Sequence, residues 1–167
     1  MTDYTFEYKN LFSEAIEKKL HRWVKKFPDE QKQSAVIPGL HILQDEHGGY
    51  LTKDLMDLLA NYLEMPNIKV YEVASFYSMY DLDEVGRHKL NVCTNISCLL
   101  RGSKEIVAHI EKRLGIKMGE TTKDGRITFR QVECQGACTG APMLEVDKQF
   151  YENLTCEKVD QILDSLE

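Results

Sequence analysis

Hydrophobic residues in the first half of the chain recur with the spacing of α-helices. The first pattern predicts a helix that ends before Pro28, because proline disfavours helical backbone in the residue that precedes it. A second pattern covers residues 30–46, where Pro38 implies a kink or a boundary. A third helix is expected between Thr52, which can cap its N-terminus, and Pro66. The three apolar faces consist of Ile16, Leu20, Trp23, Val24 and Phe27; of Val36, Leu40 and Leu43; and of Leu55, Leu58, Leu59, Tyr62 and Leu63.

A fourth short helix is expected where Asn67 can act as its cap, and the pattern changes after Asp81. Residues 88–93 alternate in polarity, which is typical of a strand, and residues 103–114 carry a helical face that ends at Gly115. The remaining predicted elements are a strand over residues 126–134, a hairpin of MLEV and QFYEN around the Asp147–Lys148 turn, and a helix from about Thr155 that buries Val159, Ile162, Leu163 and Leu166.

The order of these elements predicts an α+β protein with two domains. Residues 1–84 form an N-terminal helical bundle, and residues 85–167 follow the order β-α-β-β-β-α. That order is typical of a small thioredoxin-like α/β layer, in which helices pack on a four-stranded sheet. With 167 residues, the chain is long enough to bury a real core in such a domain and to carry a smaller appendage.

Charge and hydropathy exclude several classes of protein. The formal net charge of -6 provides no basic footprint, so we expect no nucleic-acid partner. The N-terminus has no apolar core like that of a secretory signal, and no window approaches the roughly 18 apolar residues that a membrane-spanning helix requires. We therefore expect a cytoplasmic protein without direct membrane insertion. In that compartment thiols stay reduced, so its cysteines are more suited to metal binding or redox work than to disulfides.

Four of the five cysteines form two pairs. Cys93 and Cys98 are separated by four residues in CTNISC, Cys134 and Cys138 by three in CQGAC, and 35 residues lie between the pairs. Four thiolates from two loops can hold a four-cysteine [2Fe-2S] cluster, which makes one-electron transfer the leading interpretation.

The surroundings of the pairs suit anionic sulfur. We expect Cys98 at or just before the N-terminus of the helix over residues 103–114, where free N–H groups and the helix dipole favour negative charge. Gly136 and Gly140 flank the second pair and, without side chains, let main-chain N–H groups approach the sulfides of a cluster closely. Arg101 is a candidate for a nearby positive charge.

Other interpretations of the cysteines differ in how well they fit. A structural zinc site also accepts cysteine pairs at such spacings and stays open as an alternative, in which the chain is an interaction module without redox activity. A redox dithiol needs C-x-x-C, and a Rieske centre needs two histidines in the motifs; both are absent.

Cys156 stands apart and is expected to be a packing or surface residue. No phosphate-binding glycine loop or hydrolytic triad is present, so we expect no independent catalysis.

The segments CTNISCLLRGS and GIKMGETTKDGRITFRQVECQGACTGAP closely resemble the [2Fe-2S] subunits of NADH-quinone oxidoreductases, which in mitochondria are known as the 24 kDa subunit. VYEVASFYSMY and IPGLHILQDEHGGYL extend the resemblance over nearly the whole chain. It implies a thioredoxin-like ferredoxin domain preceded by a helical bundle, with one [2Fe-2S] cluster. It also implies that Cys93, Cys98, Cys134 and Cys138 are the ligands of that cluster.

The same resemblance implies partners and a location. The partners are a flavoprotein subunit that binds FMN and NADH, and further subunits of the peripheral arm of the respiratory complex. The chain would lie on the cytoplasmic side of the inner membrane, or the matrix side in mitochondria, attached only through the complex. Similar subunits occur in NAD-linked hydrogenases and formate dehydrogenases, and the compact form without a fused domain favours the respiratory complex. The N-terminal helices favour a docking role. Phe76, Tyr77 and Tyr80 are expected either to contact a partner or to fill the seam between the bundle and the ferredoxin domain.

Overall fold

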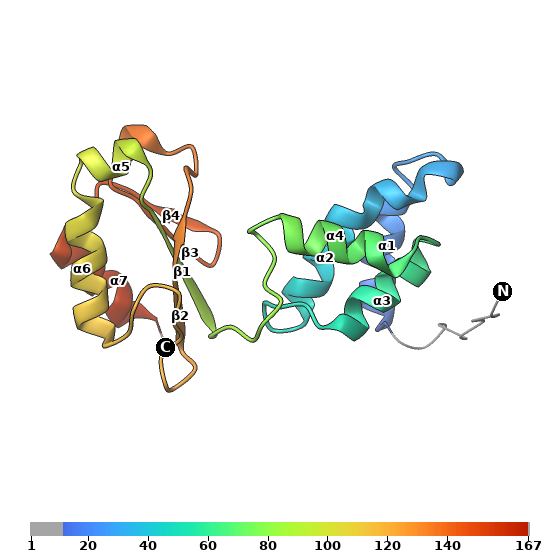
Figure 1. Ribbon diagram of the computed structural model, residues 1–167, viewed down its shortest axis with the longest axis horizontal. Coiled ribbons are helices and arrows are strands. Elements are labelled where there is room, and N and C mark those ends of the chain that lie inside the picture. The colour runs from blue at the N-terminus through green and yellow to red at the C-terminus, as the bar shows by residue number, and fades with distance from the viewer. Residues whose placement is uncertain (1–11, 167) are drawn as a thin grey trace. The chain divides into compact units, whose positions relative to one another are not determined.

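The computed structural model describes residues 12–166. The chain divides into two compact units, with the division between Glu84 and Val85. Helices make up the first unit, whereas the second contains a four-stranded sheet with helices beside it (Figure 1). This organisation confirms the predicted α+β fold. Within the described residues, no helix combines the length and the apolar character that crossing a bilayer requires.

The elements of the first unit follow the predicted pattern closely. They are α1 (Glu14–Val24), the 3₁₀ segment η1 (Asp29–Ala35), α2 (Val36–Glu46), α3 (Lys53–Tyr62) and α4 (Asn67–Phe76). Those of the second unit are β1 (His88–Cys93), α5 (Ile96–Leu100), α6 (Ser103–Leu114), β2 (Ile127–Val132), the 3₁₀ turn η2 (Cys138–Gly140), β3 (Leu144–Val146), β4 (Gln149–Tyr151) and α7 (Cys156–Ser165).

Local signals determine where the helices of the first unit begin. The Thr52 hydroxyl accepts the Leu55 N–H at 3.3 Å and caps α3, as predicted. The boundary expected near Pro38 is confirmed, because α2 begins two residues before it and places proline in the first turn, where no N–H is needed. The predicted cap of α4 is wrong: Asn67 is the first helical residue, and Pro66 occupies the cap position without a side-chain hydrogen bond.

A buried glutamine anchors the segment that follows α4. The Gln44 side chain donates to the Met79 carbonyl at 3.1 Å and accepts the Asp81 N–H at 2.7 Å. Tyr80 is 6% exposed and its hydroxyl donates to the Ile37 carbonyl at 2.9 Å, while burial raises the pKa of Tyr80 to about 12. Tyr80 therefore belongs to the helical core. That core also contains Leu20, Leu40, Leu43, Leu51, Leu59, Leu63, Val70 and Ala74.

The sheet of the second unit has the strand order β2-β1-β3-β4. β1 and β2 are parallel, and the β1–β3 and β3–β4 pairs are antiparallel. Helices α6 and α7 cover one face of the sheet (Figure 1). Because side chains alternate between faces, every second strand residue enters the core beneath these helices. The strand residues of this core are Leu90, Val92, Ile127, Phe129, Leu144 and Val146, and the helices contribute Ile106, Ile110, Val159, Ile162 and Leu163.

The second unit matches the predicted elements except near the cysteines. The hairpin is confirmed, with φ of 49° at Asp147 and 74° at Lys148, the positive values that a tight two-residue turn requires. The last helix begins after Thr155, whose hydroxyl caps it. The strand predicted over residues 126–134 is shorter at both ends, and the short helix α5 had no counterpart in the prediction.

A matched pair of aliphatic substitutions tests the core of the first unit. Leu59→Ala should lower the free energy of unfolding by about 2–5 kcal/mol, because Leu59 is fully buried and its removal leaves a cavity. Ile68→Ala, at a 58% exposed position of α4, should change it by less than about 0.5 kcal/mol. Guanidinium unfolding followed by far-UV circular dichroism measures both, and equal effects would contradict the packing described for the helices.

Candidate metal centre

Parallel pairing of β1 and β2 brings the two cysteine motifs to one edge of the sheet. The register pairs Cys93, the last residue of β1, with Val132, the last residue of β2. Since parallel strands end at the same edge, the loops that follow them leave side by side. Cys98 lies five residues beyond the end of β1, and Cys134 two residues beyond the end of β2.

The first pair is buried. Cys93 is 2% exposed and Cys98 is 1% exposed, and both pack against Ala141 and Met143. Cys98 lies inside α5, which is separate from α6, so the expectation that it occupies the N-terminus of the helix over residues 103–114 is wrong. Gly102 explains the separation, because its positive φ of 97° interrupts the helical backbone between α5 and α6.

The second pair lies at the surface. Cys134 and Cys138 are both exposed, and their sulfurs are 3.3 Å apart. The Gly136 N–H donates to the Cys134 sulfur at 3.4 Å, and the φ of 81° at Gly136 is a value that favours glycine. A main-chain N–H therefore contacts a cysteine sulfur at Gly136, and the approach expected toward the sulfides of a cluster stays a prediction.

Gly140 lies in a closely packed position. Its N–H donates to the Ala137 carbonyl at 3.1 Å. A Cβ atom at this position would overlap the Glu152 side chain. Glycine is thus required here by packing against β4 and its following loop, which no local sequence signal indicates.

Burial dominates the electrostatics of Cys98. Together with a hydrogen bond to Cys93, it raises the pKa of Cys98 to about 11. The Met143 N–H opposes this increase by hydrogen bonding to the Cys98 sulfur. The charge of Cys138 also acts on Cys98, so the two pairs are electrostatic neighbours.

Hydrogen bonds dominate the second pair. The pKa of Cys134 is lowered because the Gly136 N–H and the Cys138 thiol both donate to its sulfur. The pKa of Cys138 is raised, chiefly by its hydrogen bond with Cys134, although the Ser97 hydroxyl opposes that increase. Ser97 belongs to α5 and directly precedes Cys98.

A polar contact joins the two cysteine loops. The Asn95 side-chain N–H donates to the Glu133 carboxylate at 3.0 Å. The side-chain oxygen Oδ1 of Asn95 accepts the Ile96 N–H at 2.7 Å and thereby caps α5. No pattern in the sequence pointed to Asn95, Ser97 or Glu133 as functional residues. All three lie within or beside the cysteine motifs, but only the folded chain shows which of them face one another.

The donor set fits a [2Fe-2S] cluster. All five cysteines are free thiols, and four of them form two adjacent pairs whose sulfurs accept hydrogen bonds. A binuclear cluster requires such a set of four thiolates. Among residues 12–166, no three or more histidine, cysteine or acidic side chains are gathered around a single point as ligands of one ion. Cys156, the first residue of α7, lies outside the packed cluster of Cys93, Cys98, Ala141 and Met143.

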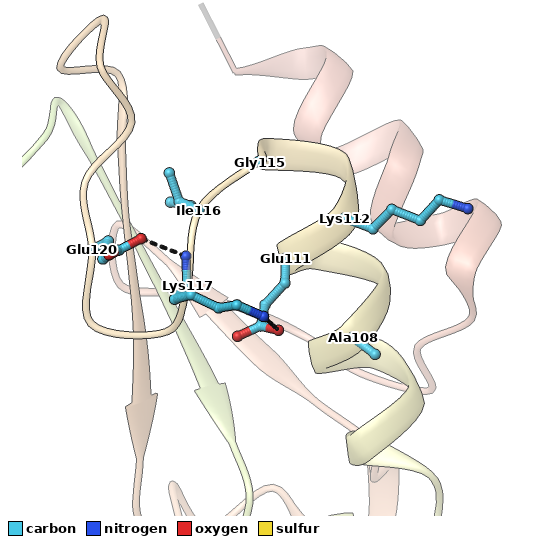
Figure 2. A pocket seen from close by; sticks show the side chains of 7 residues that line it. All are labelled: Ala108, Glu111, Lys112, Gly115, Ile116, Lys117 and Glu120. Carbon is cyan, nitrogen blue, oxygen red and sulfur yellow. Dashed lines mark hydrogen bonds and ion pairs between the residues drawn. The ribbon is translucent and has the colours of Figure 1, made fainter.

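Two hollows of the second unit lie along α6. One of about 290 Å³ is found at the C-terminal end of this helix (Figure 2). The Lys117 ammonium group pairs with the Glu111 carboxylate at 2.9 Å, and the Lys117 backbone N–H donates to the Glu120 carboxylate at 2.6 Å. An adjoining hollow of about 230 Å³ extends to Thr94 and Leu99. Neither is lined by a cysteine, and the candidate site remains the thiol cluster.

Comparisons with known proteins identify the family of the chain. Residues 20–167 match the family described as thioredoxin-like [2Fe-2S] ferredoxin. The chain is 42% identical over 168 residues to the E subunit of NADH-quinone oxidoreductase from Rickettsia conorii, covering 100% of this chain and 96% of the relative. It is 38% identical over 165 residues to the Dictyostelium discoideum protein named NADH dehydrogenase [ubiquinone] flavoprotein 2, mitochondrial, covering 99% of this chain and 64% of that protein.

A solved structure shares the fold. The crystal structure of an NAD+-reducing [NiFe]-hydrogenase in the air-oxidized state contains a similar chain, with a TM-score of 0.66 and 18% sequence identity. The match covers 75% of this chain but only 22% of the hydrogenase chain. At this identity the likeness concerns the fold alone.

The different exposure of the two pairs predicts different reactivity in the chain without metal. A brief iodoacetamide pulse should modify Cys134 and Cys138 more than about tenfold faster than Cys93 and Cys98, because only the former are exposed. Mass spectrometry of the digested protein measures each site, and unfolding in guanidinium should equalise the rates. Modification of Cys93 at the rate of Cys134 in the folded chain would contradict the burial of the first pair.

Proposed function

Because the chain belongs to the thioredoxin-like [2Fe-2S] ferredoxin family, we propose that Cys93, Cys98, Cys134 and Cys138 hold one [2Fe-2S] cluster. When bound, the cluster supplies one-electron transfer. The protein's part is to gather four thiolates, to direct N–H and O–H groups at their sulfurs, and to bury one pair away from water. The observation that carries the proposal is the convergence of both cysteine pairs at one edge of the β1–β2 ladder.

The chain is a subunit of an oxidoreductase complex, as its relatives of about 40% identity are. We propose that it serves NADH-quinone oxidoreductase and exchanges electrons with FMN on a flavoprotein partner, alongside further peripheral-arm subunits. Hydride chemistry then belongs to the partner. The near-complete coverage of the Rickettsia conorii relative supports this assignment over a role in an NAD-linked hydrogenase or formate dehydrogenase. The location follows from the complex: the cytoplasmic side of the inner membrane, or the matrix side in mitochondria.

The N-terminal domain, residues 1–84, is proposed to dock the cluster domain, residues 85–167, onto its partners. Apolar side chains exposed on α4 support this role. Ile68 is 58% exposed and Phe76 is 80% exposed, while the neighbouring Tyr80 is buried in the helical core. A folded bundle that leaves such residues at its surface has apolar area available for a protein interface.

Metal and sulfide analysis distinguishes the cluster from a zinc site. The purified protein should be reddish-brown, should contain about two irons and two acid-labile sulfides per chain, and should give an EPR signal on reduction. A colourless protein with one zinc would instead support a structural interaction module.

Cysteine variants test the ligand assignment directly. Cys134→Ser should bleach or greatly distort the visible spectrum, because a thiolate ligand is lost. Cys156→Ser should leave the spectrum unchanged, since four ligands remain. Visible absorbance of the two variants, prepared in parallel, is the measurement, and equal loss in both would refute the assignment.

Activity measurements test whether NADH oxidation requires the flavoprotein partner. The isolated chain should show no NADH oxidation with ferricyanide as acceptor, because the sequence contains no dinucleotide-binding motif. Addition of the flavoprotein subunit should be required for turnover. Measurable oxidation by the chain alone would overturn this prediction.

A further inference from the structure

A side-chain hydrogen bond connects the two loops that carry the cysteines. The Thr94 N–H donates to the Val132 carbonyl at 3.4 Å where β1 and β2 end. Asn95 and Glu133 are the next residues on the two sides, and the Asn95 side-chain N–H donates to the Glu133 carboxylate at 3.0 Å. This Asn95–Glu133 link therefore continues the pairing of the strands into the loops, although 38 positions separate the two residues along the chain.

Asn95 also organises α5, the helix that contains Cys98. The side-chain oxygen of Asn95 accepts the Ile96 N–H at 2.7 Å, and its main-chain carbonyl accepts the Leu99 N–H at 2.8 Å. The same side chain thus uses its oxygen to cap the helix and its N–H group to bind Glu133. Both functions together set where the helix lies relative to the second cysteine loop.

Apolar burial does little to hold α5 in place. Of its five residues, Cys98 is buried, whereas Ile96 is 69% exposed and Leu100 is 80% exposed. A helix of one to two turns is not stable by itself in water, so its position depends on contacts at its ends. The cap and the link at Asn95 provide such contacts at the N-terminal end.

The second cysteine loop is also poorly anchored. Glu133, Cys134 and Cys138 are exposed, and the partly buried Ala137 packs against the small cluster of buried residues around Cys93. Segments with few buried contacts open locally at a low cost in free energy. A hydrogen bond from one weakly anchored loop to the other must break before they separate, and it therefore opposes the opening of both.

We propose that Asn95 is a positioning residue, whose hydrogen bond to Glu133 holds the two cysteine loops together and slows the loss of the cluster. The inference rests on the proposed function, because it requires a cluster at the four cysteines. Neither Asn95 nor Glu133 is one of the proposed ligands, and both act through the loops on which those ligands lie.

The substitutions Glu133→Gln and Glu133→Met test the link in the full chain with its cluster. Both remove the charge and keep nearly the same shape, but only Gln offers an amide oxygen to the Asn95 N–H. With an excess of a strong iron chelator, the visible absorbance should bleach about threefold to tenfold faster in the Met variant, because a hydrogen bond that opposes opening is lost. The decay of absorbance with time measures both rates.

Exchange of donor and acceptor provides a rescue test. Asn95→Asp keeps a side chain that caps helices well, but it removes the N–H donor and places two carboxylates beside each other. Its cluster should bleach faster than that of the wild type, also in about 1 M salt, where repulsion is screened. Adding Glu133→Gln supplies an N–H group on the opposite side, so the double variant should return to within about twofold of the wild-type rate. A residue that served only as a cap would leave Asn95→Asp unchanged.

Hydrogen exchange tests the link without a cluster. In the metal-free full chain, the Leu99 N–H, which donates to the Asn95 carbonyl, should exchange about threefold to tenfold faster in Glu133→Met than in Glu133→Gln. The N–H of Ile110, a fully buried residue of α6, is the control and should exchange equally in both variants. NMR spectroscopy in D₂O measures the two amides in the same sample.

The outcomes separate this inference from the proposed function. Equal bleaching rates for Glu133→Met and Glu133→Gln would overturn the inference, although the cluster and its ligands would still stand. A double variant that bleaches as fast as Asn95→Asp would also overturn it. An absence of cluster in the wild-type chain would overturn the proposed function instead. If Glu133→Met does not retain a cluster through purification, the Leu99 exchange rates decide, and equal rates in the two variants would refute the link.

Discussion

The parallel pairing of β1 with β2 is the constraint on which the site depends. With Cys93 opposite Val132, both strands deliver their following loops to one edge, and cysteines more than thirty residues apart become neighbours. An antiparallel pairing of the same strands would place the loops at opposite ends of the sheet. Apolar residues from both strands lie in the core under α6 and α7, so the interactions that stabilise the sheet also assemble the thiol cluster.

The site is asymmetric in a way that suits electron transfer. Cys93 and Cys98 are buried against Ala141 and Met143, whereas Cys134 and Cys138 lie at the surface. Four thiolates concentrate negative charge, which the chain offsets with main-chain N–H groups such as that of Gly136. The buried pair limits access of water, and the exposed pair leaves one side of the proposed cluster close to the surface that a partner can approach.

Much of the fold could be predicted from the sequence, because short local sequence signals determine several of its helix boundaries and its hairpin turn. The Thr52 cap, the boundary near Pro38 and the Asp147–Lys148 turn each depend on a few adjacent residues. The five-residue helix α5 was missed because it is too short to show a hydrophobic period, and Cys98 was consequently assigned to the wrong helix. The Asn95–Glu133 contact and the packing of Gly140 against Glu152 join distant segments, so no local pattern could indicate them.

Anomalous diffraction from crystals of the purified protein, collected on both sides of the iron absorption edge, tests the central claim most directly. We predict two iron positions between the Cys93–Cys98 and Cys134–Cys138 pairs, with all four sulfurs as ligands. A single anomalous scatterer that responds at the zinc edge, or irons bound elsewhere in the chain, would contradict the assignment of a binuclear cluster to these cysteines.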